Sequence, residues 1–128
     1  MRIEHVAMWA DDLELLRKFY VRYFGAIAGE KYVNPAKGFS SYFLSFPDGP
    51  GRLEIMNGPS LVNHSQSNRA KGFCHLAISV GSMKKVDLLT EELRSAGVVV
   101  ISEPRMTGDG YYESVIADPE GNQIEITA

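Results

Sequence analysis

The sequence consists of two similar halves, and this internal duplication constrains the fold more than any other feature. Residues 3–8 read IEHVAM and residues 73–78 read FCHLAI, each with a histidine followed by an aliphatic residue and an alanine. Further along, RLEIM at 52–56 is matched by QIEIT at 123–127. All four segments alternate in the manner of half-buried β-strands. The chain therefore encodes one supersecondary unit twice.

The spacing of the matched residues supports this duplication. His75 follows His5 by 70 residues, and Glu125 follows Glu54 by 71 residues. Nearly equal offsets at both ends of the repeat indicate that the intervening segments also correspond. We therefore expect the two histidines to be structural equivalents of each other, and the two glutamates likewise.

A capped helix is predicted in each half, directly after the first strand. The first helix is expected to begin near Asp11 or Asp12 and to end at Gly25. The second is expected to begin near Ser82 and to end at Gly97. Apolar residues recur at helical spacing between these limits, which predicts one buried face on each helix.

Short strands broken by Gly, Pro and Asp follow each helix. We expect them at 27–33, 39–46, 52–57, 98–103, 111–117 and 122–127. The chain then forms a single domain made of two βαβββ modules, at about 1–58 and 72–128, joined by a polar linker at about 59–71. The predicted fold class is α+β, with mostly antiparallel strands and two helices on the outer face.

Composition excludes several classes of function. With 128 residues, 45% hydrophobic and 23% charged, the chain has the composition of one globular domain. Acidic residues outnumber basic ones by 16 to 13, which argues against nucleic-acid binding. We expect no membrane span and no signal peptide, because apolar runs are short and the N-terminal segment soon becomes acidic. The single cysteine, Cys74, excludes an internal disulfide, so a cytoplasmic location is expected.

Strand alternation gathers polar side chains on the faces opposite the aliphatic residues. These faces collect His5, Glu54, His75 and Glu125. One strand histidine or glutamate alone is more often structural or solvated, but four at equivalent positions favour a divalent metal site. Imidazole and carboxylate suit Ni, Co or Zn, with Mn and Fe(II) as further candidates. Cys74 falls on the aliphatic face and is predicted to be a core residue.

This order of His, Glu, His and Glu on two βαβββ modules resembles the vicinal oxygen chelate superfamily, which includes glyoxalase I, methylmalonyl-CoA epimerase, bleomycin-resistance proteins and dioxygenases. The opening IEHVAMWADDLELLRKFYVRYFG and the ending DPEGNQIEI carry the resemblance, which covers residues 2–127. It implies a curved, cup-shaped sheet of eight strands. It also implies a homodimer whose shared metal site takes His5 and Glu54 from one chain and His75 and Glu125 from the other.

The four-ligand set is most similar to that of glyoxalase I. The resemblance implies a metal-dependent isomerase or lyase that acts on a small oxygen-chelating metabolite through a metal-stabilised enediolate. Glu125 is the preferred base and Glu54 the alternative. An epimerase of the methylmalonyl-CoA type stays open, although such enzymes usually have an amide in place of Glu54. A non-catalytic drug- or metabolite-binding protein is a third alternative, although such members tend to lose the metal ligands.

The substrate side departs from the glyoxalase I pattern. Bacterial glyoxalase I usually has an arginine where this chain has Trp9, and an asparagine where it has Gly58, with Asn57 one position earlier. These departures argue against glutathione. The predicted substrate-contacting residues are Trp9, Phe73 and Asn57, with Tyr42 and Tyr112 as further candidates on the same faces.

Overall fold

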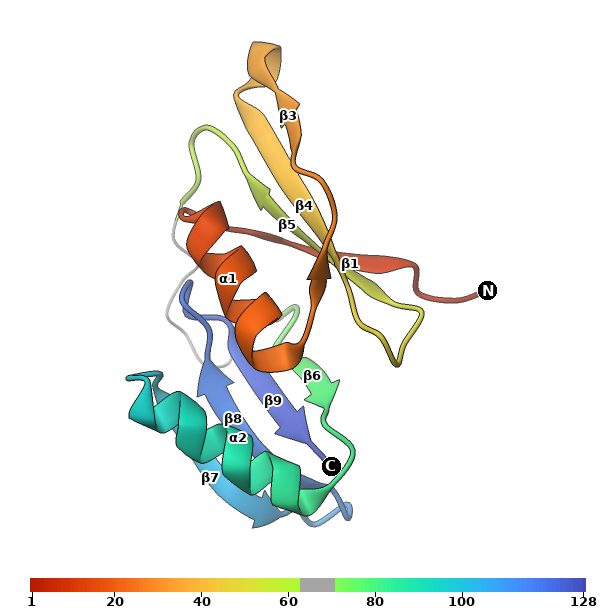
Figure 1. Ribbon diagram of the computed structural model, residues 1–128, viewed down its shortest axis with the longest axis vertical. Helices are drawn as coiled ribbons and strands as arrows, with labels where there is room; N and C mark the ends of the chain where they lie inside the picture. The colour runs from red at the N-terminus through yellow and green to blue at the C-terminus, as the bar shows by residue number, and fades with distance from the viewer. Residues whose placement is uncertain (63–70) are drawn as a thin grey trace. The chain divides into compact units, whose positions relative to one another are not determined.

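A computed structural model describes residues 1–62 and 71–128 of the chain. The chain divides into two compact units, Met1–His64 and Ser65–Ala128, and each is described here by itself (Figure 1). We call them module one and module two. Most of the predicted linker at 59–71 lies outside the described residues, so the prediction of one domain with these boundaries stays a prediction. No described helix has the length and apolar character needed to cross a bilayer.

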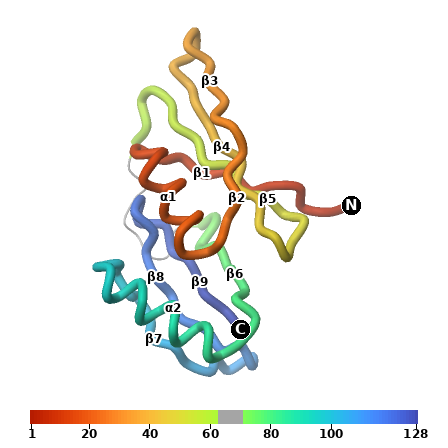
Figure 2. The backbone as a smooth tube through the Cα atoms, viewed as in Figure 1, coloured from red at the N-terminus to blue at the C-terminus, as the bar shows by residue number. Residues whose placement is uncertain are grey.

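Module one contains one helix, five strands and a short 3-10 turn that connects two of the strands. Its elements are β1 (His5–Trp9), α1 (Leu13–Phe24), β2 (Ile27–Ala28), β3 (Tyr32–Asn34), η1 (Pro35–Lys37), β4 (Phe39–Ser45) and β5 (Arg52–Asn57). The sheet order is β1-β5-β4-β2, and β3 pairs with another part of β4. Within the described part of module one, β1 and β5 are the only pair that runs parallel. Helix α1 packs against β4 and β5, and the chain path can be followed by colour in Figure 2.

Module two repeats this plan with one helix and four strands. Its elements are β6 (Leu76–Ser79), α2 (Met83–Ser95), β7 (Val100–Met106), β8 (Tyr112–Ala117) and β9 (Gln123–Thr127). The sheet order is β6-β9-β8-β7, with β6 parallel to β9 and the remaining pairs antiparallel. Helix α2 lies across this sheet (Figure 1).

The predicted α+β class with two helix-covered modules is confirmed, but the strand count differs. The described residues form nine strands in two open sheets rather than eight strands in one. The segment expected as one strand at 27–33 splits into β2 and β3, which pair with different parts of β4. The chain leaves the β4 ladder after Gly29, whose N–H donates to the Phe43 carbonyl, and rejoins it at Tyr32.

Strand β7 extends three residues beyond its predicted end at 103, through Pro104. Proline lacks the N–H that a ladder requires, and this made the segment a poor strand candidate. The register between β7 and β8 shifts on both sides of Ser102, and β7 lies at the edge of its sheet. A bulged edge strand tolerates proline, because the residue there needs no partner.

Strand β6 begins at Leu76, three residues later than predicted. Its parallel partner β9 begins at Gln123 and pairs with β6 from Ile124 to Thr127, and the chain turns just before β9, so the ladder does not continue along residues 73–75. Cys74 is consequently exposed, and its predicted place in the core is wrong.

Both helices begin where the sequence predicts. The Asp12 side chain accepts the Leu15 N–H, and α1 ends at Gly25 with a positive φ of 64°. Only glycine adopts this left-handed conformation without a steric penalty. The Ser82 side chain caps α2, which ends at Ser95, slightly before the predicted Gly97.

Apolar side chains between helix and sheet form the core of each module. In module one they are Ala10, Leu13, Leu16, Phe19, Tyr20, Ala26, Leu44, Leu53 and Ile55. In module two they are Val86, Leu93, Ile116, Ile124 and Ile126. Module two also buries a polar pair, because the Thr90 hydroxyl bonds the Ser114 hydroxyl at 2.7 Å and the Val86 carbonyl at 2.7 Å. These cores fix which strand faces remain open to function.

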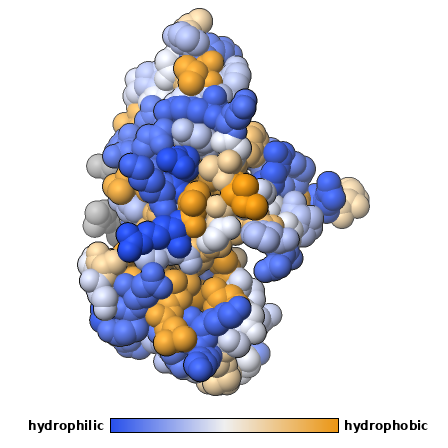
Figure 3. Space-filling model, in the orientation of Figure 1, coloured by the Kyte–Doolittle hydropathy of each residue, from blue (hydrophilic) through white to orange (hydrophobic). Residues whose placement is uncertain are grey.

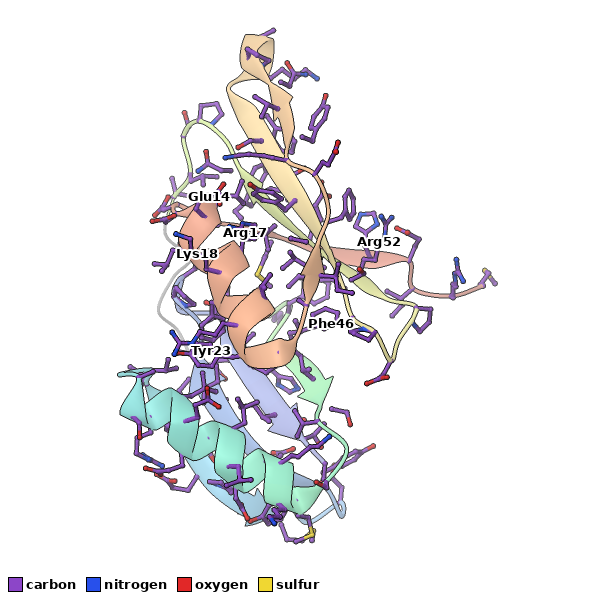
Figure 4. All side chains as sticks on the ribbon, viewed as in Figure 1. Glu14, Arg17, Lys18, Tyr23, Phe46 and Arg52 are labelled. Atoms are coloured by element: carbon purple, nitrogen blue, oxygen red, sulfur yellow. The ribbon has the colours of Figure 1, made fainter. Side chains whose placement is uncertain are left out.

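An ion-pair cluster around Glu14 ties α1 to the sheet of module one. The Glu14 carboxylate accepts from the Tyr42 hydroxyl at 2.8 Å, from Arg17 Nε at 3.0 Å and from Lys31 Nζ at 3.1 Å. Figure 4 shows Glu14 and Arg17 at the start of the helix, and Figure 3 shows mainly hydrophilic residues over α1. These bonds, led by that of Tyr42, lower the Glu14 pKa from 4.5 to about 2.

We expect the Glu14 cluster to stabilise module one at neutral pH and to lose this contribution in acid. A carboxyl whose pKa is lower in the folded chain contributes stability above its unfolded pKa, near 4.5, and loses it as the pH falls toward 2. Since the Glu14 side chain is 43% exposed, we expect only about 1 kcal/mol. Urea unfolding of Glu14→Gln at pH 7 and pH 3 tests this. An equal loss of stability at both pH values would contradict it, and Glu30→Gln is the surface control.

Candidate metal-binding site

In module one, the parallel pairing of β1 with β5 brings an imidazole and a carboxylate together. Glu54 lies opposite Ala7 in the ladder, which places its side chain on the face shared by His5 and Trp9. His5 Nε2 lies 3.8 Å from Glu54 Oε2. The His5 side chain is 40% exposed and that of Glu54 only 16%. The pair therefore stands at the open face of the sheet, with the carboxylate partly desolvated.

Module two repeats this pair at the equivalent positions. His75 immediately precedes β6, and Glu125 lies opposite Ala77 in the parallel ladder with β9. His75 Nε2 lies 3.5 Å from Glu125 Oε2, and the two side chains are 42% and 15% exposed. The same parallel register in both modules thus pairs one histidine with one glutamate.

These pairs have the donor chemistry and spacing of metal ligands. Two ligands bound at about 2.1 Å and separated by an angle of about 90–110° lie about 3.0–3.4 Å apart. The observed separations of 3.8 and 3.5 Å need only small side-chain adjustments to reach that range. Among the described residues, no group of three or more potential ligands is assembled. Each module by itself therefore offers one histidine–glutamate pair, and the predicted four-ligand set stays a prediction.

The first pair has supporting contacts that the sequence alone did not suggest. The His5 Nδ1 atom lies 2.5 Å from Glu4 Oε2, and Glu4 also bonds Arg52. Because a carboxylate only accepts, the Nδ1 atom is the donor in this contact, and Nε2, on the Glu54 side, is the ring nitrogen that could bind a metal. Arg52 lies over the Phe43 ring at 4.2 Å, and Figure 4 shows it beside β1. The bond from His5, followed by that from Arg52, lowers the Glu4 pKa.

We expect Glu4→Ala to weaken metal binding about tenfold. Without the carboxylate, the His5 ring loses the bond that fixes its orientation and tautomer, and such supporting contacts are worth about 10- to 100-fold in affinity. The lower end applies because Glu4 is 51% exposed. Competition with a coloured chelator measures the affinity, and Glu30→Ala is the control. Unchanged affinity in Glu4→Ala would show that this contact does not orient the ligand.

Module two instead has a third carboxyl beside its pair. Glu113 on β8 lies opposite Thr127 in the ladder with β9, one diagonal step from Glu125. It is 8% exposed, and Arg105 Nη2 lies 3.6 Å from its carboxylate. Burial first, and then the charge of Glu125, raise the pKa of Glu113. Sequence reasoning missed this residue, although alternation along 111–117 places it on the Glu125 face once the register is known.

The predicted substrate-contacting residues are placed in different surroundings. Trp9 is 52% exposed on the His5 face, whereas Phe73 is 94% exposed and precedes β6. The Asn57 amide donates to the backbone carbonyls of Ala10 and Asp11 and so holds the approach to α1. A substrate contact by Phe73 or Asn57 stays a prediction.

The two tyrosines proposed for the open faces lie on the opposite, helix-covered faces. The Tyr42 hydroxyl donates to Glu14 on α1, and the Tyr112 hydroxyl donates to Asp87 on α2. Their predicted place near the metal face is wrong. The physical reason is register, because Tyr42 lies opposite Ile55, whose side chain is in the core.

Two helix-covered βαβββ modules, each with a histidine and a glutamate on its open face, define a class of duplicated α+β proteins. The chain belongs to the Glyoxalase/Bleomycin resistance protein/Dioxygenase superfamily, whose family model matches residues 2–126. The resemblance drawn from the sequence is thereby confirmed.

Individual relatives agree with this membership. Mitochondrial methylmalonyl-CoA epimerase from Bos taurus is 29% identical over 106 residues, which cover 73% of this chain and 59% of that protein. The chain thus spans less than two thirds of this curated relative. A V278E mutant of glyoxalase I from Zea mays has a TM-score of 0.80 at 25% identity, covering 98% of this chain and 44% of that one. A glyoxalase family protein from Enterococcus faecalis has a TM-score of 0.81 at 24% identity, covering 99% and 97%.

Proposed function

We propose that this protein is a metal-dependent, glyoxalase I-like isomerase or lyase that acts on a small oxygen-chelating metabolite. The observation that carries the proposal is the pairing of one imidazole with one carboxylate at equivalent positions of both modules, at 3.8 and 3.5 Å. A single pair would be an ordinary surface contact. Its repetition on matched strands, with both carboxylates about 15% exposed, supports a common role in ligand binding.

The residues proposed to hold the ion are His5, Glu54, His75 and Glu125. Two neutral imidazoles and two carboxylates carry a charge of −2, which balances a divalent cation, and Ni, Co or Zn fits these donors best. The resemblance to glyoxalase I supports a divalent metal in this role. The metal, when bound, would supply Lewis acidity toward a carbonyl oxygen of the substrate. In our proposal the two halves of the site meet across a homodimer.

The protein's own groups would then move the proton. A glutamate on the open face is proposed to take the proton from the carbon beside the carbonyl and to return it to the neighbouring carbon. Glu125 is the first choice for this base and Glu54 the alternative. Both stand on the open faces next to a histidine, so either could act without a change of backbone conformation.

An epimerase acting beside a thioester carbonyl is the second candidate. The similarity to methylmalonyl-CoA epimerase from Bos taurus favours it, and the two reactions begin with the same proton abstraction. They differ in the carbon to which the proton returns. Glu54 argues for the isomerase, since the resemblance predicts an amide at this position in the epimerase.

The decisive experiment compares both reactions on the same preparation. Protein loaded separately with Ni, Co or Zn is given preformed methylglyoxal–thiol adducts with several thiols, and thioester formation is followed by absorbance. A parallel sample receives a CoA thioester in deuterated solvent, and mass spectrometry follows deuterium incorporation. Thioester formation supports the proposal, and deuterium wash-in alone supports the epimerase. Absence of both from fully metallated protein would refute metal-dependent proton transfer on these substrates.

A further inference from the structure

Module one contains a pocket that the proposed metal chemistry does not use. It opens beside Trp9, the last residue of β1, between the β3–η1–β4 hairpin and the segment at 58–62. We call it the Trp9 pocket. Its volume is about 630 Å³, within the range of small-molecule sites. The residues used below are Trp9, Tyr32, Lys37, Phe39 and Gly58, all of which line it.

Three aromatic rings form a continuous wall in this pocket. The Trp9 and Phe39 rings meet edge to face, with centroids 6.2 Å apart and an interplanar angle of 89°. Phe39 in turn contacts Tyr32, with centroids 6.1 Å apart. Trp9 is 52% exposed and Tyr32 56% exposed. Such rings offer a flat ligand stacking and edge contacts, and they lose little rotamer freedom on binding.

Gly58 makes room for this wall. A Cβ atom built at Gly58 would lie 3.3 Å from Trp9 Cζ3 and 4.0 Å from Phe39 Cδ2. A larger residue at 58 would push against the indole, so tryptophan at 9 and glycine at 58 are a matched pair. The two departures from the glyoxalase I pattern therefore meet in one pocket and change its chemistry together.

Lys37 is the one cation among the described residues that line the pocket, and none of these residues is a carboxylate. Lys37 ends the η1 turn, which Asn34 fixes because its side chain accepts the Lys37 N–H at 3.3 Å. Among residues 1–62 and 71–128, no carboxylate lies within ion-pair distance of the Lys37 ammonium. The pocket thus combines an apolar wall of aromatic rings with one positive charge.

We propose that the Trp9 pocket binds a planar aromatic carboxylate, with its ring against Trp9 and Phe39 and its carboxylate on Lys37. Trp9 shares a strand face with His5 and lies four residues away, about 13 Å along β1. The group bound here would be the non-chelating end of the substrate, and in this respect the inference rests on the proposed function. Binding to the pocket itself requires no metal.

The chain offers a direct reporter, because Trp9 is its single tryptophan. Its indole N–H gives one peak in a ¹H–¹⁵N spectrum. Metal-free protein is titrated with 2-naphthoate, with neutral 2-naphthalenemethanol and with the non-planar cyclohexanecarboxylate. We expect saturable movement of the indole peak with naphthoate, about threefold to fivefold weaker binding of the neutral alcohol, and no saturation with cyclohexanecarboxylate.

Variants test separately how much the Lys37 charge and the aromatic rings contribute to probe binding. Lys37→Gln should weaken naphthoate binding about threefold to fivefold and leave the alcohol unchanged. Lys18→Gln, an exposed lysine on α1 outside the pocket, should change neither. Gly58→Val should weaken binding of both probes, because the added side chain presses against the Trp9 ring. If that variant fails to fold by circular dichroism, Phe39→Leu should instead weaken both about twofold to tenfold.

The outcomes distinguish this proposal from the proposed function. An indole peak that does not move with millimolar naphthoate, or moves equally with the alcohol, would refute the pocket assignment, whatever the metal assay shows. A peak that changes with protein concentration and ignores the probes would show that a second copy covers Trp9, which also refutes it. Saturable naphthoate binding by protein without turnover would uphold the pocket and count against the metal chemistry alone.

Discussion

Replacing Glu125 with glutamine is expected to reduce metal-dependent turnover by at least a factor of about 100. The amide keeps the size of the side chain but can neither take a proton nor balance half of the charge of a divalent ion. The side chain is 15% exposed on the open face, with Thr127 and Gln123 on the same side of β9, so the exchange leaves the core untouched. Steady-state kinetics with the substrate that the proposed assays identify measure the loss.

Three further variants are compared with Glu125→Gln. Glu92→Gln, on the exposed side of α2, should retain full activity. His75→Ala should lose both metal and turnover, because a ligand is removed rather than a base. Comparison of Glu54→Gln with Glu125→Gln identifies the base. The base is the glutamate whose substitution abolishes turnover while the protein still binds metal. Wild-type activity in Glu125→Gln would exclude Glu125 as the base, and unfolding of the variant would assign it a structural role.

The second large effect concerns the isoleucine beside this glutamate. Ile126→Ala is expected to lower the free energy of unfolding by about 2–5 kcal/mol. Ile126 is fully buried and lies between Ile78 on β6 and Ser114 on β8 in the sheet beneath α2. Truncation removes apolar contacts and leaves a cavity that the surrounding strands fill only partly.

Urea unfolding followed by circular dichroism tests this expectation. Ile101→Ala on the edge strand β7, where the side chain is 49% exposed, should cost less than about 1 kcal/mol. Ile126→Val should fall between the two, at about 0.5–1.5 kcal/mol. A loss below about 1 kcal/mol in Ile126→Ala would mean that β9 is not anchored in a packed core.

The candidate site could be read from the sequence wherever strand alternation and duplication decide it. His5, Glu54, His75 and Glu125 required only the period of two and the matched offsets. Glu113 required the register of β8 against β9, because alternation alone does not say which residues of neighbouring strands are adjacent. The faces of Tyr42 and Tyr112 were predicted wrongly for the same reason, since a one-residue difference in phase moves a side chain to the other face of the sheet.

The Trp9 pocket required more than register. Its wall brings together residues 9, 32 and 39, and its floor comes from the segment that begins at Gly58. The sequence marked Trp9 and Gly58 as departures from a pattern, but not as neighbours. Only the parallel register of β1 and β5, in which Trp9 lies opposite Met56 and Gly58 follows two residues later, shows that one accommodates the other.

The sequence by itself therefore determined the duplicated α+β plan, where each helix begins, and the strand faces on which the two histidines and two glutamates lie. These follow from local rules of capping and strand alternation, which act over a few residues and are repeated in both halves. The tertiary structure decided where β6 begins, that β7 passes through Pro104, which carboxyl stands beside Glu125 and what surrounds Trp9. These depend on which distant segments supply partners for hydrogen bonds and packing, and a strand extends only as far as such a partner exists.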